Sequence, residues 1–138
     1  WFAQDTGSSV HATSSTADRN KGDGAYVQDG ASMVLEHSQC NNNGRDGWGA
    51  WRTGSSIRAA SSKADRNKRD GAHVQDGGAS MVLEHSQCNG NEEEGWYVQD
   101  AGSTITVSGS QAVGNKQANT REAKGGRIIC LDSEQLIN

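Results

Sequence analysis

Short stretches along this chain alternate between apolar and polar residues. The alternation is clearest at residues 32–38, 56–61 and 104–109. A period of two is typical of a β-strand with one buried face, because successive side chains of a strand point to opposite sides. Asn, Asp and Gly gather between these stretches, and they are the residues that favour turns. The pattern therefore predicts an all-β chain.

The strands recur in a repeat. Residues 14–41 and 61–89 are near copies, because 25 of 28 aligned positions are identical and the second copy has one inserted Gly. A shorter repeat lies inside, marked by asparagines spaced by 23, 24, 24 and 24 residues. This asparagine column contains Asn20, Asn43, Asn67, Asn91 and Asn115. A unit of about 24 residues cannot bury its own apolar face and must stack on its neighbours. We therefore predict a parallel β-solenoid with five regular coils and a partial sixth.

The units follow the order Asn-x-x-x-Gly, a short strand, a turn such as Asp-Gly-Ala that ends in Gly followed by Ala or Ser, an alternating strand, and Ser-x-Cys/Ala-x-x-Asn. This order resembles the right-handed parallel β-helix family, which includes pectate lyases, polysaccharide epimerases, tailspikes and many surface proteins. The resemblance covers residues 1 to about 119. It implies the fold but no particular activity, because the whole family shares this scaffold.

We expect residues 1–138 to form one domain, in which residues 1–119 hold the regular coils. The pattern loosens after Asn115. Residues 120–138 are expected to contain the end of a longer turn, a last strand and a partial cap. Open solenoid ends expose strand edges and core side chains, so we also expect self-association or a larger parent chain.

Equivalent positions of stacked coils form columns with a spacing of ~4.8 Å. Trp1, Trp48 and Trp96 alternate with Ala25 and Ala72 in one such column, and each Trp falls in a coil whose other apolar residues are small. Volume compensation in a close-packed core is therefore favoured over a sugar-stacking ladder. The asparagine column, and a serine column at Ser15, Ser38, Ser62, Ser86 and Ser110, are interpreted as buried hydrogen-bonded ladders that set register.

One outward face is expected to carry an aromatic side chain in every coil. These candidate ligand-binding residues are Phe2, Tyr26, Trp51, His73 and Tyr97. Exposed rings suit a polysaccharide or a partner with flat apolar patches. The alternative is that the rings only stabilise the sheet, as aromatic pairs on neighbouring strands do.

Two acidic columns also recur. The first contains Asp5, Asp29, Asp76 and Asp100, and the second contains Asp23, Asp46, Asp70 and Glu94. Stacked carboxylates could bind Ca²⁺ or supply the paired acids of glycan cleavage. Turn capping by Asp explains them more simply. We therefore assign no catalytic residue, no metal site and no cofactor, with calcium as the open alternative. Most candidate residues occur twice, whereas an active site is normally single.

The net charge and the composition exclude further classes of function. The net charge is 13 − 17 = −4, so there is no basic surface for nucleic acid. No apolar run reaches the ~20 residues of a membrane span. We expect a non-enzymatic structural or adhesive module, outside the cell or on a cell or virion surface, that contacts polysaccharide. The first alternative is a fragment of a polysaccharide lyase, epimerase or hydrolase whose catalytic coils lie elsewhere. A weaker alternative is ice binding through a column at Ser9, Ser32, Ser56, Ser80 and Thr104.

Overall fold

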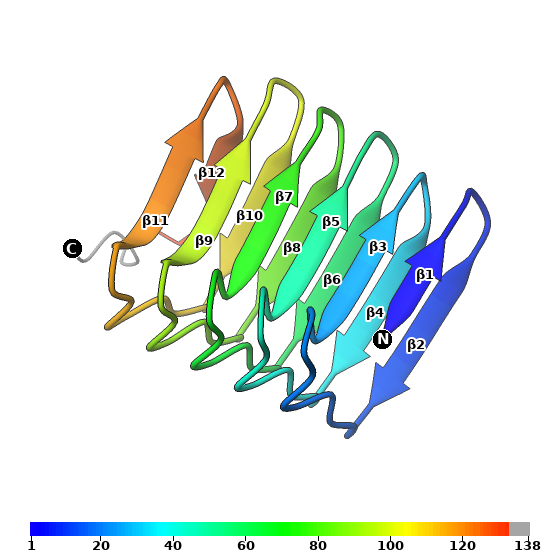
Figure 1. The fold of residues 1–138 in the computed structure, drawn as a ribbon. Helices are drawn as coiled ribbons and strands as arrows, with labels where there is room; N and C mark the ends of the chain where they lie inside the picture. The colour runs from blue at the N-terminus through cyan, green and yellow to red at the C-terminus, as the bar shows by residue number, and fades with distance from the viewer. Residues whose placement is uncertain (133–138) are drawn as a thin grey trace.

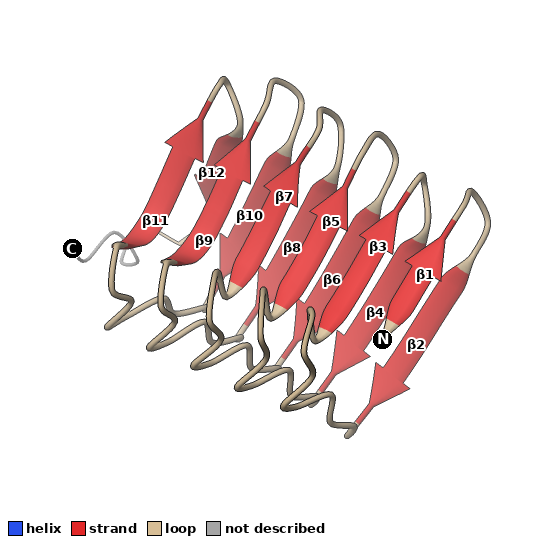
Figure 2. Ribbon diagram, viewed as in Figure 1, coloured by secondary structure: helices blue, strands red, loops and turns tan. Residues whose placement is uncertain are grey.

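The computed structural model describes residues 1–132 and winds them into stacked coils with two parallel β-sheets (Figures 1 and 2). The first sheet contains, in spatial order, β1 (Phe2–Gln4), β3 (Ala25–Gln28), β5 (Trp48–Trp51), β7 (Ala72–Gln75), β9 (Glu94–Gln99) and β11 (Ala118–Ala123). The second sheet contains β2 (Ser9–Thr13), β4 (Ser32–Glu36), β6 (Ser56–Ala60), β8 (Ser80–Glu84), β10 (Thr104–Ser108) and β12 (Arg127–Cys130). The described residues contain no helix. The predicted β-solenoid is confirmed.

Neighbouring strands in each sheet come from successive coils, as the continuous colour change across Figure 1 shows. The register places Ile57 between Met33 and Met81, so residues about 24 apart become neighbours. Their side chains point between the two sheets and are almost fully buried. The inward columns were therefore predicted correctly.

The tryptophan column is part of this core. Trp48 and Trp96 are 0% and 2% exposed, and Ala25 and Ala72 between them are also buried. Trp1, in the first coil, is partly exposed. The buried indoles confirm volume compensation and exclude a sugar-stacking role for Trp48 and Trp96, because a buried ring has no free face.

The two polar columns form the predicted ladders. The Nδ2 of Asn43 donates to Asn67 Oδ1 at 3.1 Å, and the Nδ2 of Asn67 donates to Asn91 Oδ1 at 3.1 Å. Each of these Oδ1 atoms also accepts the backbone N–H of the asparagine one coil earlier. In the serine column, the hydroxyls of Ser62 and Ser86 accept backbone N–H groups in the same way. These bonds satisfy buried donors that would otherwise be unpaired.

The end of the chain differs from the expectation. The longer turn predicted beyond Asn115 is instead a strand at residues 118–123, and β11 pairs in parallel with β9. β11 keeps the regular interval, because Ala118 pairs with Glu94, 24 residues earlier, and Asn119 continues the ladder by accepting from Asn115 Nδ2 at 3.2 Å. The last strand forms as β12. The expected cap at residues 133–138 lies outside the described residues.

The search for transmembrane segments is negative for the part of the chain that the structure describes. No helix there has the length and apolar character needed to cross a bilayer.

Candidate functional site

The five predicted rings form one continuous stack on the outer face of the first sheet. The ring centroids of Phe2 and Tyr26 lie 5.6 Å apart, and those of Tyr26 and Trp51 lie 5.1 Å apart. The stack continues from Trp51 to His73 at 6.0 Å and from His73 to Tyr97 at 4.7 Å. It thus crosses β1, β3, β5, β7 and β9. The sequence located every ring of this stack.

The exposed fraction of the rings differs sharply along the stack. The expectation that His73 is an exposed ligand-binding ring is wrong. Phe2 is 56% exposed, and Tyr26, Trp51 and Tyr97 are partly exposed. His73 is only 2% exposed. Its partner in the register of β5 is Gly49, which has no side chain, so Trp51 leans into that space and contacts the imidazole. With Tyr97 on the other side, the imidazole cannot serve as a ligand-binding ring.

A row of glutamine side chains runs beside the rings. The phenol of Tyr26 donates to Gln28 Oε1 at 2.6 Å, and that of Tyr97 donates to Gln99 Oε1 at 2.6 Å. The amide of Gln99 donates in turn to Gln75 Oε1 at 3.0 Å. The tyrosine rings are therefore held in place, with side-chain amides next to them.

The first acidic column does not gather into a site. Asp5, Asp29, Asp76 and Asp100 each have a positive φ, between 56° and 71°, at the turn that follows a strand of the first sheet. Asp tolerates this left-handed conformation better than most residues. Arg52 has the same conformation in the third coil and pairs with Asp29 at 2.7 Å. These residues form the turn.

The second acidic column is buried beneath the rings. Asp46 and Asp70 are 0% exposed, and Glu94 is 2% exposed. Asp46 and Asp70 lie two residues before β5 and β7 begin, one coil apart. The Oδ1 of Asp46 accepts the backbone N–H of Asp70 at 3.1 Å, and the Oδ1 of Asp70 accepts that of Glu94 at 2.9 Å. These bonds join successive coils, so the column forms a ladder between coils and not the expected turn caps, and the ladder uses only one oxygen of each carboxylate.

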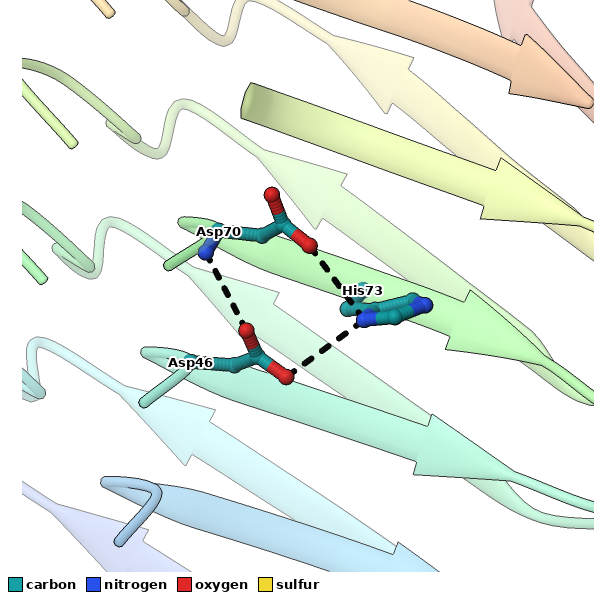
Figure 3. A group of neighbouring side chains, drawn as sticks. All are labelled: Asp46, Asp70 and His73. Carbon is teal, nitrogen blue, oxygen red and sulfur yellow. Dashed lines mark hydrogen bonds and ion pairs between the residues drawn. The ribbon is translucent and has the colours of Figure 1, made fainter. Parts of the chain in front are cut away.

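The other oxygens point at His73 (Figure 3). The Nδ1 of His73 lies 3.4 Å from Asp46 Oδ2 and 3.2 Å from Asp70 Oδ2. Neither oxygen, and neither ring nitrogen, has a hydrogen-bond partner among the described residues. Sequence analysis missed this group, which we call the acid–histidine cluster. The exchange of Tyr26 for His73 between the two long copies was the signal that could have revealed it.

Burial and mutual repulsion make this cluster electrostatically costly. Burial, followed by the nearby charge of Asp46, raises the pKa of Asp70 to about 8. The same two causes raise the pKa of Asp23, one coil before Asp46. Adjacent carboxylates with little access to water favour the protonated form. The column thus carries more negative charge than the fold can easily accommodate.

Replacing Asp70 with Asn is expected to raise the free energy of unfolding by about 1–2 kcal/mol in a chelating buffer, since it removes a carboxyl that burial makes costly to ionise and keeps the Oδ1 acceptor. Urea unfolding measures the change. The matched control is Asp65→Asn, because Asp65 Oδ1 accepts a backbone N–H from Asn89 at 2.7 Å in a half-buried column. That variant should be nearly neutral. A loss of stability in Asp70→Asn would mean that the contact with His73 holds the fold together.

Comparison with known proteins agrees with the architecture. A family model described as the right handed beta helix region matches residues 3–135. No curated protein and no solved structure was found to be similar to the chain.

Proposed function

The chain belongs to the right-handed β-helix family, and from that premise we propose that it is a non-enzymatic structural or adhesive module that contacts polysaccharide. Its place would be outside the cell or on a cell or virion surface. The stack of rings on the first sheet is the observation that carries this proposal. The contact surface consists of Phe2, Tyr26, Trp51 and Tyr97, since His73 is buried.

Trp51 is the expected anchor. Its plane is turned 87° from that of Tyr26. Its Nε1 lies 3.5 Å from the place where a Cβ on Gly49 would be, so the indole covers the bare backbone of β5. An aromatic face lying over a strand suits the flat apolar face of a sugar ring. Arg45 stands 5.8 Å from the centre of the same ring and adds a cation at its margin.

The glutamine row supports the same ligand class. Gln28, Gln75 and Gln99 are partly exposed and lie beside the rings. Primary amides offer both donors and acceptors, which match the hydroxyl groups of a sugar. Rings with adjacent amides are the combination of apolar surface and few polar groups that small-molecule sites use.

Replacing Trp51 with Ala is expected to weaken polysaccharide binding roughly 3- to 10-fold, the effect of losing an aromatic contact worth ~0.5–1.5 kcal/mol beyond its area. A glycan array selects the polysaccharide, and titration calorimetry measures the affinity. Arg58→Ala on the second sheet is the control, because Arg58 is exposed there and pairs with Glu84. Equal binding by the Trp51 and Arg58 variants would contradict this surface.

The alternative is a fragment of a polysaccharide-acting enzyme. An assay for reducing ends and unsaturated uronates on the glycans that bind separates the two functions. Binding without turnover supports the module. Turnover that is abolished by Asp76→Asn would replace it with an enzymatic function.

A further inference from the structure

The acid–histidine cluster of Asp46, Asp70 and His73 carries more charge than backbone capping requires. A neighbouring column caps the same kind of backbone N–H with alternating acids and amides. Its members are Asp18, Asn41, Asp65 and Asn89. In that column Asn accepts the backbone N–H as well as Asp does, and the two aspartates are therefore two coils apart. In the cluster, Asp46 and Asp70 occupy successive coils and are completely buried.

One carboxylate oxygen of Asp46 and one of Asp70 take no part in the ladder, and both point toward His73. Each Asp uses Oδ1 for the ladder and directs Oδ2 at His73 (Figure 3). These Oδ2 atoms and the Nδ1 of His73 have no hydrogen-bond partner among residues 1–132. All three residues are at least 98% buried. Buried polar atoms without a partner are rare in folded proteins, and an ion bound between them is one physical explanation for such a group.

The spacing of these three atoms fits a metal ion. Ligands at ~2.0 Å in a tetrahedral zinc site stand ~3.3 Å apart. The two measured separations from His73 Nδ1 are 3.4 Å and 3.2 Å, and the three ligand atoms all lie within 4.8 Å of one another. One imidazole nitrogen with two carboxylate oxygens is a donor set for a divalent transition metal, whereas Ca²⁺ and Mg²⁺ prefer oxygen alone.

The local charge balance leaves room for a cation. The other members of the acidic column each have an arginine nearby. These pairs are Asp23 with Arg45 at 4.0 Å, Asp46 with Arg69 at 3.9 Å, and Glu94 with Arg121 at 3.0 Å. Among the described residues, Asp70 forms no ion pair with an arginine or lysine, and His73 is its one ion-pair partner. A cation between Asp46 and Asp70 would therefore meet at least one carboxylate that no arginine neutralises.

The two long copies of the repeat differ at the position of His73. The two long copies differ at only three of their aligned positions. One of them, Tyr26 to His73, supplies the imidazole of the cluster, and another, Gly22 to Arg69, places a guanidinium 3.9 Å from Asp46. Among the described residues this combination of two buried aspartates and a histidine occurs once, because the equivalent position of the first copy is Tyr26.

We propose that Asp46, Asp70 and His73 bind one Zn²⁺ ion through Asp46 Oδ2, Asp70 Oδ2 and His73 Nδ1. The competing arrangement is a protonated imidazole held between two carboxylates. Both arrangements bring the same atoms together, but only the first requires a metal. The ion would tie the starts of β5 and β7 together beneath the aromatic stack, independently of any polysaccharide.

Metal binding by the whole chain tests the proposal. The protein is unfolded, stripped with a chelator, and refolded with or without Zn²⁺, because the cluster is closed in the folded state. We expect one Zn²⁺ per chain by mass spectrometry of the dialysed protein, and a rise in Tm of roughly 5 °C or more in micromolar excess of the metal. Refolding with Co²⁺ should give the visible absorption of a tetrahedral site.

His73→Gln and Asp70→Asn should each weaken Zn²⁺ binding by about 100-fold or more and abolish the Co²⁺ spectrum, a larger effect than the 10- to 100-fold typical of outer-shell partners. Asp70→Asn retains its ladder acceptor, so it should fold. His85→Gln is the control, because His85 is exposed and directly follows β8 in the second sheet, whereas the cluster lies at the first. Substoichiometric zinc in the wild type would overturn the site. So would equal losses in the His73 and His85 variants, or equal stabilisation by Ca²⁺ that His73→Gln leaves intact.

Discussion

Replacing Trp48 with Ala should lower the free energy of unfolding by about 3–5 kcal/mol, the range for truncating a large buried aromatic side chain. Trp48 is 0% exposed, and its neighbours in the register are Ala25 and Ala72. These small residues cannot expand into the space that the indole leaves, so the cavity persists. Guanidinium unfolding followed by circular dichroism measures the change.

Trp51→Ala is the matched control, because Trp51 lies three residues further along the same strand and is partly exposed on the outer face. It should cost about 1 kcal/mol, close to the average for point substitutions. Similar losses in the two variants would mean that the core tolerates a void at Trp48, and volume compensation between coils would then be wrong.

Replacing Asn67 with Ala should cost about 3–5 kcal/mol, because it leaves two buried N–H groups of Asn43 without an acceptor at ~1–3 kcal/mol each. Asn67 Oδ1 accepts the backbone N–H of Asn43 at 2.9 Å and its Nδ2 at 3.1 Å. Asn67 and Asn43 are both 0% exposed, so water cannot replace the lost acceptor. Urea unfolding measures the loss.

The control for this variant is Asn20→Ala at the exposed end of the same ladder. Asn20 Nδ2 donates to Asn43 Oδ1 at 2.9 Å, and among residues 1–132 no N–H group donates to Asn20 Oδ1. A cost of at most ~1 kcal/mol is expected there. If Asn67→Ala cost no more than Asn20→Ala, the ladder would be a consequence of the register and not one of its causes.

The columns could be predicted from the sequence because each one repeats at a fixed interval. Asn43 and Asn67 are 24 residues apart, and the fold places them in hydrogen-bonding contact. The same spacing located the five rings of the aromatic stack. Prediction fails where the interval holds but the apolar pattern does not. β11 pairs with β9 at 24 residues, yet none of its side chains is fully buried, and the strand was mistaken for a turn.

Burial at one position of a column could not be predicted in this way. His73 and Tyr26 are equivalent in the repeat, yet His73 is 2% exposed and Tyr26 is partly exposed. The difference arises from Trp51, which belongs to another column and leans over Gly49. A list of columns does not record contacts between side chains of different columns.

By itself the sequence determined the parallel solenoid, the length of its coils, the two polar ladders and the inward position of Trp48, because each depends on a period that can be counted. Only the tertiary structure decided which outward side chains are free and which are covered. It alone joined Asp46, Asp70 and His73 into one cluster. The physical reason is that a repeat sets the backbone path, whereas burial and charge depend on how side chains of neighbouring coils fill the space between them.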